Sequence, residues 1–342
     1  DTGLALSGAV LAAGIAQLAF LFYGAQRSQL LLRLRLPRFS SAARRMLVLG
    51  TPGFIAASAL QVNGIIGTNI ASREPGAVSW LFYADQLYQL PLGIIGIAMG
   101  VVLMPTIGRA VKSGDETRAR QALEQGRLTA MFFALPAAAG LVVLGDFIAE
   151  ALFQDLAGRV TQILGAGGSA FNDRDVSQVG AALLIFGFGV PAFVLQKVFA
   201  AAFFAREDTK TPMRFALAAI TINASLSISL FPALGFISVP LGTIAASWTE
   251  VMLLGGTLRR RGLFGLRRLS WRLAAILLAS FSLGASLVFV KANRETLETL
   301  AFGESWLLLF AVAGLAAPLY GLVSFALGAV KLSELVGKKT KA

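Results

Sequence analysis

Apolar residues are collected into long runs separated by short polar connections, rather than spaced in amphipathic stripes. As an α-helix, a run of about 20 residues crosses the roughly 30 Å hydrocarbon core of a membrane. The pattern predicts an all-α polytopic membrane protein with nine transmembrane helices. The nine runs cover residues 4–23, 46–70, 77–107, 128–153, 179–205, 213–231, 234–257, 271–290 and 305–330.

The composition agrees with this interpretation. Of the 342 residues, 56% are apolar and 14% are charged, and the mean hydropathy is +0.73. The net charge of +12 could indicate nucleic acid as a partner, but the basic residues lie in the connections between runs and not on one soluble face. We therefore expect no nucleic-acid partner.

Basic residues are distributed unequally between alternate connections. Residues 24–45, 109–127, 204–214, 258–272 and the tail from 331 together hold 24 Lys and Arg, whereas the intervening connections hold five. The positive-inside rule predicts a cytoplasmic C-terminus and an outer N-terminus. Because an odd number of helices then begins outside and the first residue is Asp1, we expect further sequence before it.

The chain contains no Cys and no His. Disulfides, thiolate chemistry, imidazole general bases and Cys or His metal sites are thereby excluded. We expect no catalytic residue, no metal site and no cofactor. Coupling to the membrane potential or to a monovalent cation remains open.

Three charged residues lie well inside the predicted spans, whereas Asp146 and Glu150 lie close enough to an outer helix end to be interfacial. Lys197 lies within its run, where it either serves a function or extends its side chain toward the headgroups. Asp85 is too short to reach the interface, so it should face protein or a water-filled cavity, as a functional group or as a bond between helices. Glu250 is the second clear acid within a span.

The run that contains Asp85 also carries amides, glycines and a proline. Helical spacing places two Gln and three Gly on one face. The glycines are explained by close helix packing, and the proline allows a kink or hinge between the two halves. The amides and the carboxylate indicate the lining of an aqueous cavity. The residues of this face are Gln86, Gln89, Gly93, Gly96 and Gly100, and the proline is Pro91.

Several stretches resemble one family of membrane transporters. Residues 80–110 read WLFYADQLYQLPLGIIGIAMGVVLMPTIGRA, which is similar to the signature helix of the MurJ/MviN lipid II flippases, in the multidrug/oligosaccharidyl-lipid/polysaccharide exporter superfamily. The stretch FFAREDTKTPMR resembles the family's cytoplasmic link between its tenth and eleventh helices, with motif residues Arg206, Asp208, Lys210 and Pro212. Residues 49–72 are similar to its seventh helix.

The resemblance implies an arrangement of the whole chain. It aligns with the last nine of the family's fourteen helices. Residues 1–45 would be the last helix of the N-terminal lobe and a cytoplasmic linker, and residues 46–257 the C-terminal six-helix lobe of a MurJ/MATE-like transporter. Residues 258–342 would form two additional helices, which line a groove for a lipid tail, and a basic cytoplasmic tail.

The resemblance also implies a substrate cavity. Its lining would include Tyr83, Asp85, Gln86, Gln89 and Lys197. Many family members have Arg at the position of Gln86, where it is thought to contact the anionic headgroup, and some have an acid at the position of Gln89. The cavity is therefore expected to carry less charge on this side.

The implied function is transport of the peptidoglycan precursor lipid II across the bacterial cytoplasmic (inner) membrane by alternating access. Cell-wall biogenesis and cell shape would depend on it, with lipid II, membrane lipids and cell-wall synthesis proteins as partners. A multidrug or polysaccharide-unit exporter of the same superfamily and a non-transporting scaffold are the alternatives. An intramembrane enzyme is disfavoured by the absence of His and of paired intramembrane acids.

Overall fold

The computed structural model describes residues 2–28, 41–163, 171–263, 270–301 and 303–329. The described residues form helices and no strand, which confirms the predicted all-α class. The chain divides into two compact units, residues 1–48 and 49–342. The boundary falls inside helix α2 (Ser41–Ala71), close to the predicted end of the linker at residue 45.

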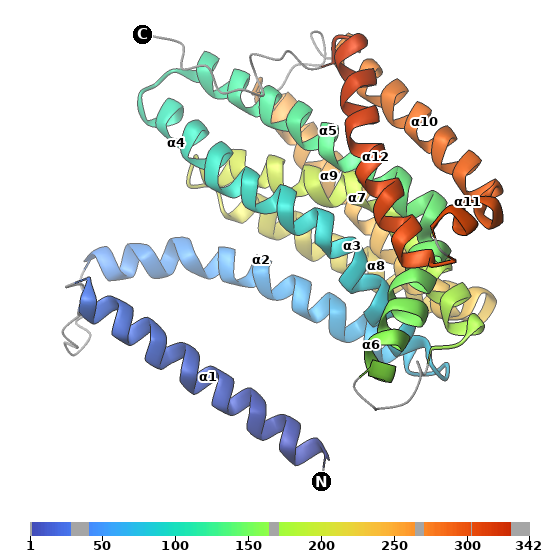
Figure 1. The fold of residues 1–342 in the computed structure, drawn as a ribbon. Coiled ribbons are helices and arrows are strands. Elements are labelled where there is room, and N and C mark those ends of the chain that lie inside the picture. The colour runs from blue at the N-terminus through green and yellow to red at the C-terminus, as the bar shows by residue number, and fades with distance from the viewer. Residues whose placement is uncertain (1, 29–40, 164–170, 264–269, 302, 330–342) are drawn as a thin grey trace. The chain divides into compact units, whose positions relative to one another are not determined.

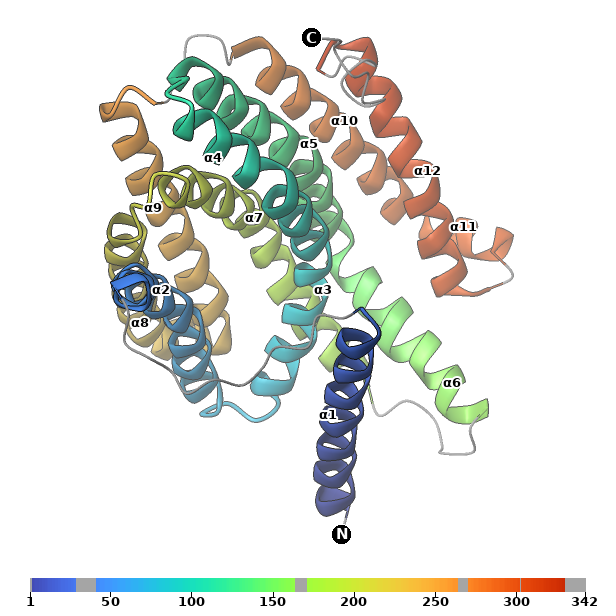
Figure 2. The same cartoon turned by 90° about the vertical axis from the view of Figure 1, so that its left-hand side faces the viewer.

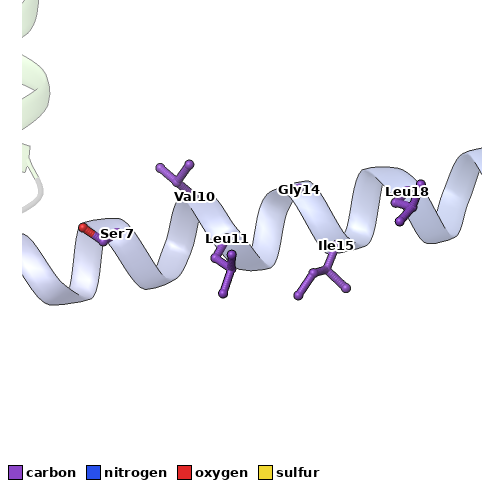
Figure 3. A pocket seen from close by; sticks show the side chains of 6 residues that line it. All are labelled: Ser7, Val10, Leu11, Gly14, Ile15 and Leu18. Carbon is purple, nitrogen blue, oxygen red and sulfur yellow. The ribbon is translucent and has the colours of Figure 1, made fainter.

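Helix α1 (Thr2–Arg27) makes up most of the described part of the first unit. Its large apolar side chains from Val10 to Tyr23 are exposed. A shallow hollow along one face is lined by residues of this helix alone (Figure 3), and a single hydroxyl is its only polar side chain. The hollow therefore offers no chemistry to a polar substrate. Its residues are Ser7, Val10, Leu11, Gly14, Ile15 and Leu18.

The second unit is a bundle of long helices joined by short turns (Figure 1). Two π-helical segments, η1 and η2, continue the helices that precede them, and one 3-10 turn, η3, joins α8 to α9. The elements after α2 are α3 (Ala77–Ala98), η1 (Met99–Leu103), α4 (Met104–Lys112), α5 (Glu116–Ala149), η2 (Glu150–Leu156), α6 (Ala157–Ile163), α7 (Asp173–Phe204), α8 (Lys210–Leu234), η3 (Gly235–Ile237), α9 (Ser238–Arg260), α10 (Ser270–Ala292), α11 (Arg294–Leu300) and α12 (Ser305–Ala326).

Helix α7 is the central element and lies between α5 and α9 (Figure 2). Small residues allow α5 and α7 to approach each other closely, as is typical of helix pairs in membranes. A Cβ atom at Gly180 would fall 2.7 Å from the Cα of Asp146, and one at Gly187 would fall 2.7 Å from Cγ2 of Val142. Larger residues at these glycines would push the two helices apart.

Helices α8 and α9 form a tight antiparallel hairpin. Gly235 has a φ of +58° at the turn, and the carboxylate of Glu74 accepts a hydrogen bond of 2.9 Å from the backbone N–H of Phe236. Inside the hairpin, Asn223 donates to Asn63 of α2 and accepts from Ser227. These neutral hydrogen bonds join α2 to the hairpin.

Seven stretches of the described residues are long and apolar enough to cross a membrane. They correspond to the predicted runs, with α8, η3 and α9 counted as one continuous stretch, and they do not include α2. A multi-pass membrane protein is therefore supported, while the count of nine crossings stays a prediction.

Helices α10 and α12 pack side by side along α5 (Figure 1). Their contact is a separate apolar cluster, and the hydroxyl of Tyr320 in α12 donates a hydrogen bond of 2.8 Å to the backbone carbonyl of Phe132 in α5. The two helices thus belong to the second unit. The buried members of the cluster are Leu144, Phe147, Ala279, Leu283, Leu287, Leu308 and Tyr320.

Candidate functional site

Helix α3, which carries Asp85 and the two Gln, packs against α7, and the two helices run in the same direction. Near their starts, the indole N–H of Trp80 donates a hydrogen bond of 2.7 Å to Asp175. About two turns further along α3, Tyr88 stacks on Phe186 and Phe193 of α7, with ring centroids 4.5 and 5.3 Å apart. These contacts fix which residues of the two helices face each other.

Lys197 of α7 meets α3 at Gly96. A Cβ atom at position 96 would fall 2.8 Å from the Lys197 Nζ, so the ammonium group occupies the space that a larger residue would fill. Lys197 is exposed, and it makes no hydrogen bond or ion pair within the described residues. Its three N–H donors are therefore available to an anionic ligand.

Asp85 and Gln89 are joined on one face of α3, where the Gln89 amide donates a hydrogen bond to the Asp85 carboxylate. Tyr88, one turn from Asp85, also interacts with this carboxylate. Gln86 is exposed on the adjacent face. The helical spacing read from the sequence thus brings Asp85 and Gln89 into contact and leaves Gln86 accessible.

Pro91 lies inside α3, and the π-helical segment η1 follows within two turns. Gly93 faces open space, since no atom lies within 4 Å of the position that a Cβ would take. At Gly96, the three nearest atoms to that position all belong to Lys197. The surroundings of Gly100 lie outside what the structure describes. Among the described residues, no close helix contact is seen at Gly93, and its packing or hinge role stays a prediction.

Tyr83 belongs to an aromatic cluster. Its ring lies 4.7 Å from that of Phe153 in η2 and 5.1 Å from that of Phe171, just before α7. The side chain is half-buried. Tyr83 thus packs α3 against the neighbouring elements, and a role as cavity lining stays a prediction.

Two polar residues inside the bundle are not indicated by the sequence. Arg127 was counted with a connection, but it lies inside α5 and only 7% of it is exposed. Gln196, next to Lys197, donates a hydrogen bond of 2.9 Å to Glu250 of α9. Their positions in sequence gave no signal, because burial of Arg127 and pairing of Gln196 depend on which helices pack together.

The motif of residues 206–212 organises one end of the bundle. Arg206 forms an ion pair of 2.6 Å with Glu116 at the start of α5. Asp208 accepts hydrogen bonds from the backbone and side chain of Thr211 and forms an ion pair of 2.7 Å with Arg261. Burial opposes ionisation of Asp208, but the bonds from Thr211 and Arg261 outweigh it and lower its pKa.

The remaining motif residues differ in burial. Lys210 is exposed and begins α8, whereas Pro212 is buried in the first turn of that helix. Proline suits this place, because the first N–H groups of a helix have no partner within it. The motif therefore joins the ends of α5, α7, α8 and α9.

Ion pairs gather at the opposite end of the bundle. Arg294 of α11 donates to both carboxylate oxygens of Glu150, at 2.7 and 2.5 Å, and to Glu298 at 2.5 Å. The hydrogen bonds that Arg294 donates to Glu150 raise the pKa of Arg294, which stays charged. Lys291 pairs with Asp146 at 2.8 Å. These contacts fasten α10 and α11 to α5 and η2.

The described residues contain no group of three or more Asp, Glu, His or Cys that could hold a metal ion. They offer two separate polar positions on the surface of α3. One is the hydrogen-bonded Asp85 and Gln89. The other is the Lys197 ammonium group at Gly96, which lies about 10 Å from Gln89 and about 17 Å from Asp85 along the helix axis. Such a surface can bind an anion at one end and neutral hydrogen-bonding groups at the other.

Comparison with known proteins places this chain among lipid-flippase sequences. The family model described as lipid II flippase MurJ matches residues 1–310. A "Probable lipid II flippase MurJ" of Rhizobium tropici is 38% identical over 335 residues, covering 96% of the chain and 60% of that relative. A protein of the same description from Rhizobium meliloti is 37% identical over 341 residues, covering 97% and 60%.

A solved structure has the same fold. It is described as lipid II flippase MurJ in an inward closed conformation, with a TM-score of 0.62 and 21% sequence identity, and the match covers 88% of this chain and 57% of that one. The chain therefore spans about three fifths of the length of the proteins that it matches.

Proposed function

Because this chain belongs to the lipid II flippase MurJ family, we propose that it is part of a transporter that moves lipid II across the bacterial inner membrane by alternating access. The activity belongs to the whole protein, since the chain spans about 60% of its relatives. Lipid II carries a pyrophosphate, two sugars and a peptide on a polyprenyl tail. Its headgroup needs a polar route through the hydrocarbon, and two lobes that rock about a central site provide one.

The observation that carries the proposal is the position of Lys197. Its ammonium group is exposed beside α3, deep within a membrane-spanning helix, and has no ion pair among the described residues. An intramembrane cation is costly, so it is retained where it meets a ligand or a partner. A charge-assisted hydrogen bond to the pyrophosphate would be roughly twice as strong as a neutral one.

The polar face of α3 supplies neutral contacts in this proposal. Gln86 is exposed and can form hydrogen bonds with the sugars or the peptide. Gln89 can do so as well, although its amide also donates a hydrogen bond to Asp85. Asp85 is negatively charged when ionised and would keep the pyrophosphate away from its end of the helix. The anionic part of the headgroup is thus directed toward Lys197. Tyr83 supports the same helix through its aromatic contacts.

The orientation follows the distribution of basic residues, with the start of this chain outside and its end in the cytoplasm. In that orientation Lys197 lies nearer the cytoplasmic end of α7, where lipid II is made available after its synthesis. Charges that move within the membrane field, such as Asp85 and Lys197, would let the membrane potential bias the transition. Membrane lipids and cell-wall synthesis proteins complete the expected set of partners.

The test uses the full-length protein in cells that depend on it. Lys197→Ala removes the ammonium group, and Lys197→Arg retains a cation. We expect Lys197→Ala to abolish exposure of radiolabelled lipid II on the outer leaflet, measured as its accessibility to an impermeant enzyme that cleaves lipid II. Lys197→Arg should retain part of the exposure, although the broader guanidinium fits the space at Gly96 less well.

Membrane abundance is measured for each variant, because a loss of protein would imitate a loss of transport. Lys112→Ala is a matched control, since Lys112 is an exposed lysine in the last turn of α4, outside the proposed site. Normal lipid II exposure with Lys197→Ala at wild-type abundance would contradict the proposed role of Lys197. Normal exposure after depletion of the full-length protein would contradict the transport function itself.

A further inference from the structure

Glu250 lies near the middle of α9. The helix extends from Ser238 to Arg260, so Glu250 is roughly 15 to 18 Å from either end. The helix belongs to the continuous stretch Lys210–Arg260, which is long and apolar enough to span a membrane. The Glu250 side chain is half-buried. Its distance from both helix ends keeps the carboxyl group away from the bulk water on either side of a membrane. It therefore differs from the acids at the ends of the bundle.

The only bonding partner of Glu250 in the described structure is neutral. The amide of Gln196 in α7 donates a hydrogen bond of 2.9 Å to its Oε2 and lies 3.4 Å from the backbone carbonyl of Ser247. By contrast, Asp146 pairs with Lys291, and Glu150 pairs with Arg294. Glu250 has no such counter-charge among the described residues.

The helices packed against α9 supply no cation in its place. Apart from Glu250, the ionisable side chains of α7, α8 and α9 lie within the first five or the last two residues of these helices, with Lys197 as the single exception. Lys197 directs its ammonium group to Gly96 of α3 and forms no ion pair with Glu250. The charged residues in the end turns are Asp173, Arg174, Asp175, Lys210, Arg214, Arg259 and Arg260.

An ionised carboxylate in the middle of a membrane costs a few kcal/mol or more, and a single amide donor offsets only part of that cost. Binding a proton removes the charge and leaves a carboxylic acid that can still accept from Gln196. We propose that Glu250 is a proton-binding site, which holds a proton in this conformation and releases it only when α7 and α9 separate enough to admit water.

Such a site makes the contact between α7 and α9 depend on proton concentration. Release of the proton leaves a charge that favours the separated, hydrated arrangement, and uptake favours the packed one. Gln196 precedes Lys197 directly in α7, so the same stretch of helix bears the proton site on one side and the α3 contact on another. This inference does not depend on the identity of the transported lipid.

The test is chemical modification with dicyclohexylcarbodiimide, an apolar reagent that reacts with protonated carboxyl groups in apolar surroundings. Membranes that contain the full-length protein are treated at pH 7.5, and the modified residue is identified by mass spectrometry of peptides. We expect modification at Glu250 and loss of that modification in Glu250→Gln. Asp146 and Glu150, whose charges are paired, should remain unmodified in the same sample.

Three outcomes would overturn the proposal. Modification at pH 5 but not at pH 7.5 would mean that the reagent reaches Glu250 and that the group is ionised at neutral pH; absence of modification at both values would contradict it too. Protection by Na⁺ at constant pH, compared with choline, would mean that the site holds an alkali ion instead. The readout is independent of lipid transport, so its failure leaves the proposed flippase function intact.

Discussion

Lys197 and Gly96, which lie on different helices and far apart in sequence, meet where α7 crosses α3. The ammonium nitrogen is 2.8 Å from the place that a Cβ of residue 96 would occupy. The absence of a side chain at this position is what allows the cation to rest against the polar helix. The contact therefore links a glycine expected to serve in helix packing with a lysine expected to bind substrate.

Replacing Gly96 by Ala should displace the Lys197 ammonium group. Ala favours helix by about 1 kcal/mol over Gly, and the contacted atom is the end of a flexible side chain, so we expect the protein to remain folded. Exposure of lipid II on the outer leaflet should fall. Gly93→Ala is the matched control, because nothing lies within 4 Å of its Cβ position. Equal transport by both variants would argue against a role for the Lys197 position.

Arg294→Ala should lower the stability of the second unit. It removes hydrogen bonds to Glu150 and Glu298 and leaves two half-buried carboxylates without their cation. We expect a loss of about 2 to 3 kcal/mol, seen as a lower unfolding temperature in detergent. Arg159→Ala serves as the comparison, because Arg159 is exposed and forms a single ion pair with Glu304. We expect this variant to lose at most about 1 kcal/mol of stability. Similar losses of stability for both variants would contradict the idea that the ion pairs of Arg294 contribute most to holding α11 against η2.

Asp208 should stabilise the protein in a pH-dependent manner. The bonds from Thr211 and Arg261 lower its pKa despite its burial, so its contribution is present above its ordinary pKa and is lost as the pH falls through the lowered value. Because Arg261 is well exposed, we expect Asp208→Asn to cost only about 1 kcal/mol at neutral pH.

The unfolding temperatures of wild type and Asp208→Asn should converge in that acidic range. Glu295→Gln, at an exposed carboxyl group in α11, serves as the control and should show no such convergence. A difference between wild type and Asp208→Asn that persisted at all pH values would mean that the ion pair does not carry the effect.

The predicted orientation can be checked with single cysteines, since the chain has none of its own. Ser72, between α2 and α3, and Ser113, between α4 and α5, are both exposed and lie at opposite ends of the continuous α3, η1 and α4 stretch. In intact cells, Ser72→Cys should react with an impermeant thiol reagent and Ser113→Cys should be shielded. The reverse labelling would invert the topology.

The sequence by itself determined the helical class and the neighbours within each helix. Long apolar runs can satisfy their backbone groups in a membrane only as helices or closed barrels, and these runs are much longer than a strand. Within α3, the 3.6-residue repeat decides which side chains share a face, and the bond between Gln89 and Asp85, four residues apart, agrees with that repeat. The apolar runs do not fix the number of crossings in the same way, because α8 and α9 are joined by a turn that is itself helical.

Only the tertiary structure decided which faces meet. Lys197 reaches Gly96, Gln196 reaches Glu250, and Arg294 reaches Glu150 across sequence separations that no periodicity spans. The same holds for Arg127, which counts as part of a polar connection until the packing of α5 buries it. These contacts depend on how small residues let one helix approach another, and that is a property of the assembled bundle.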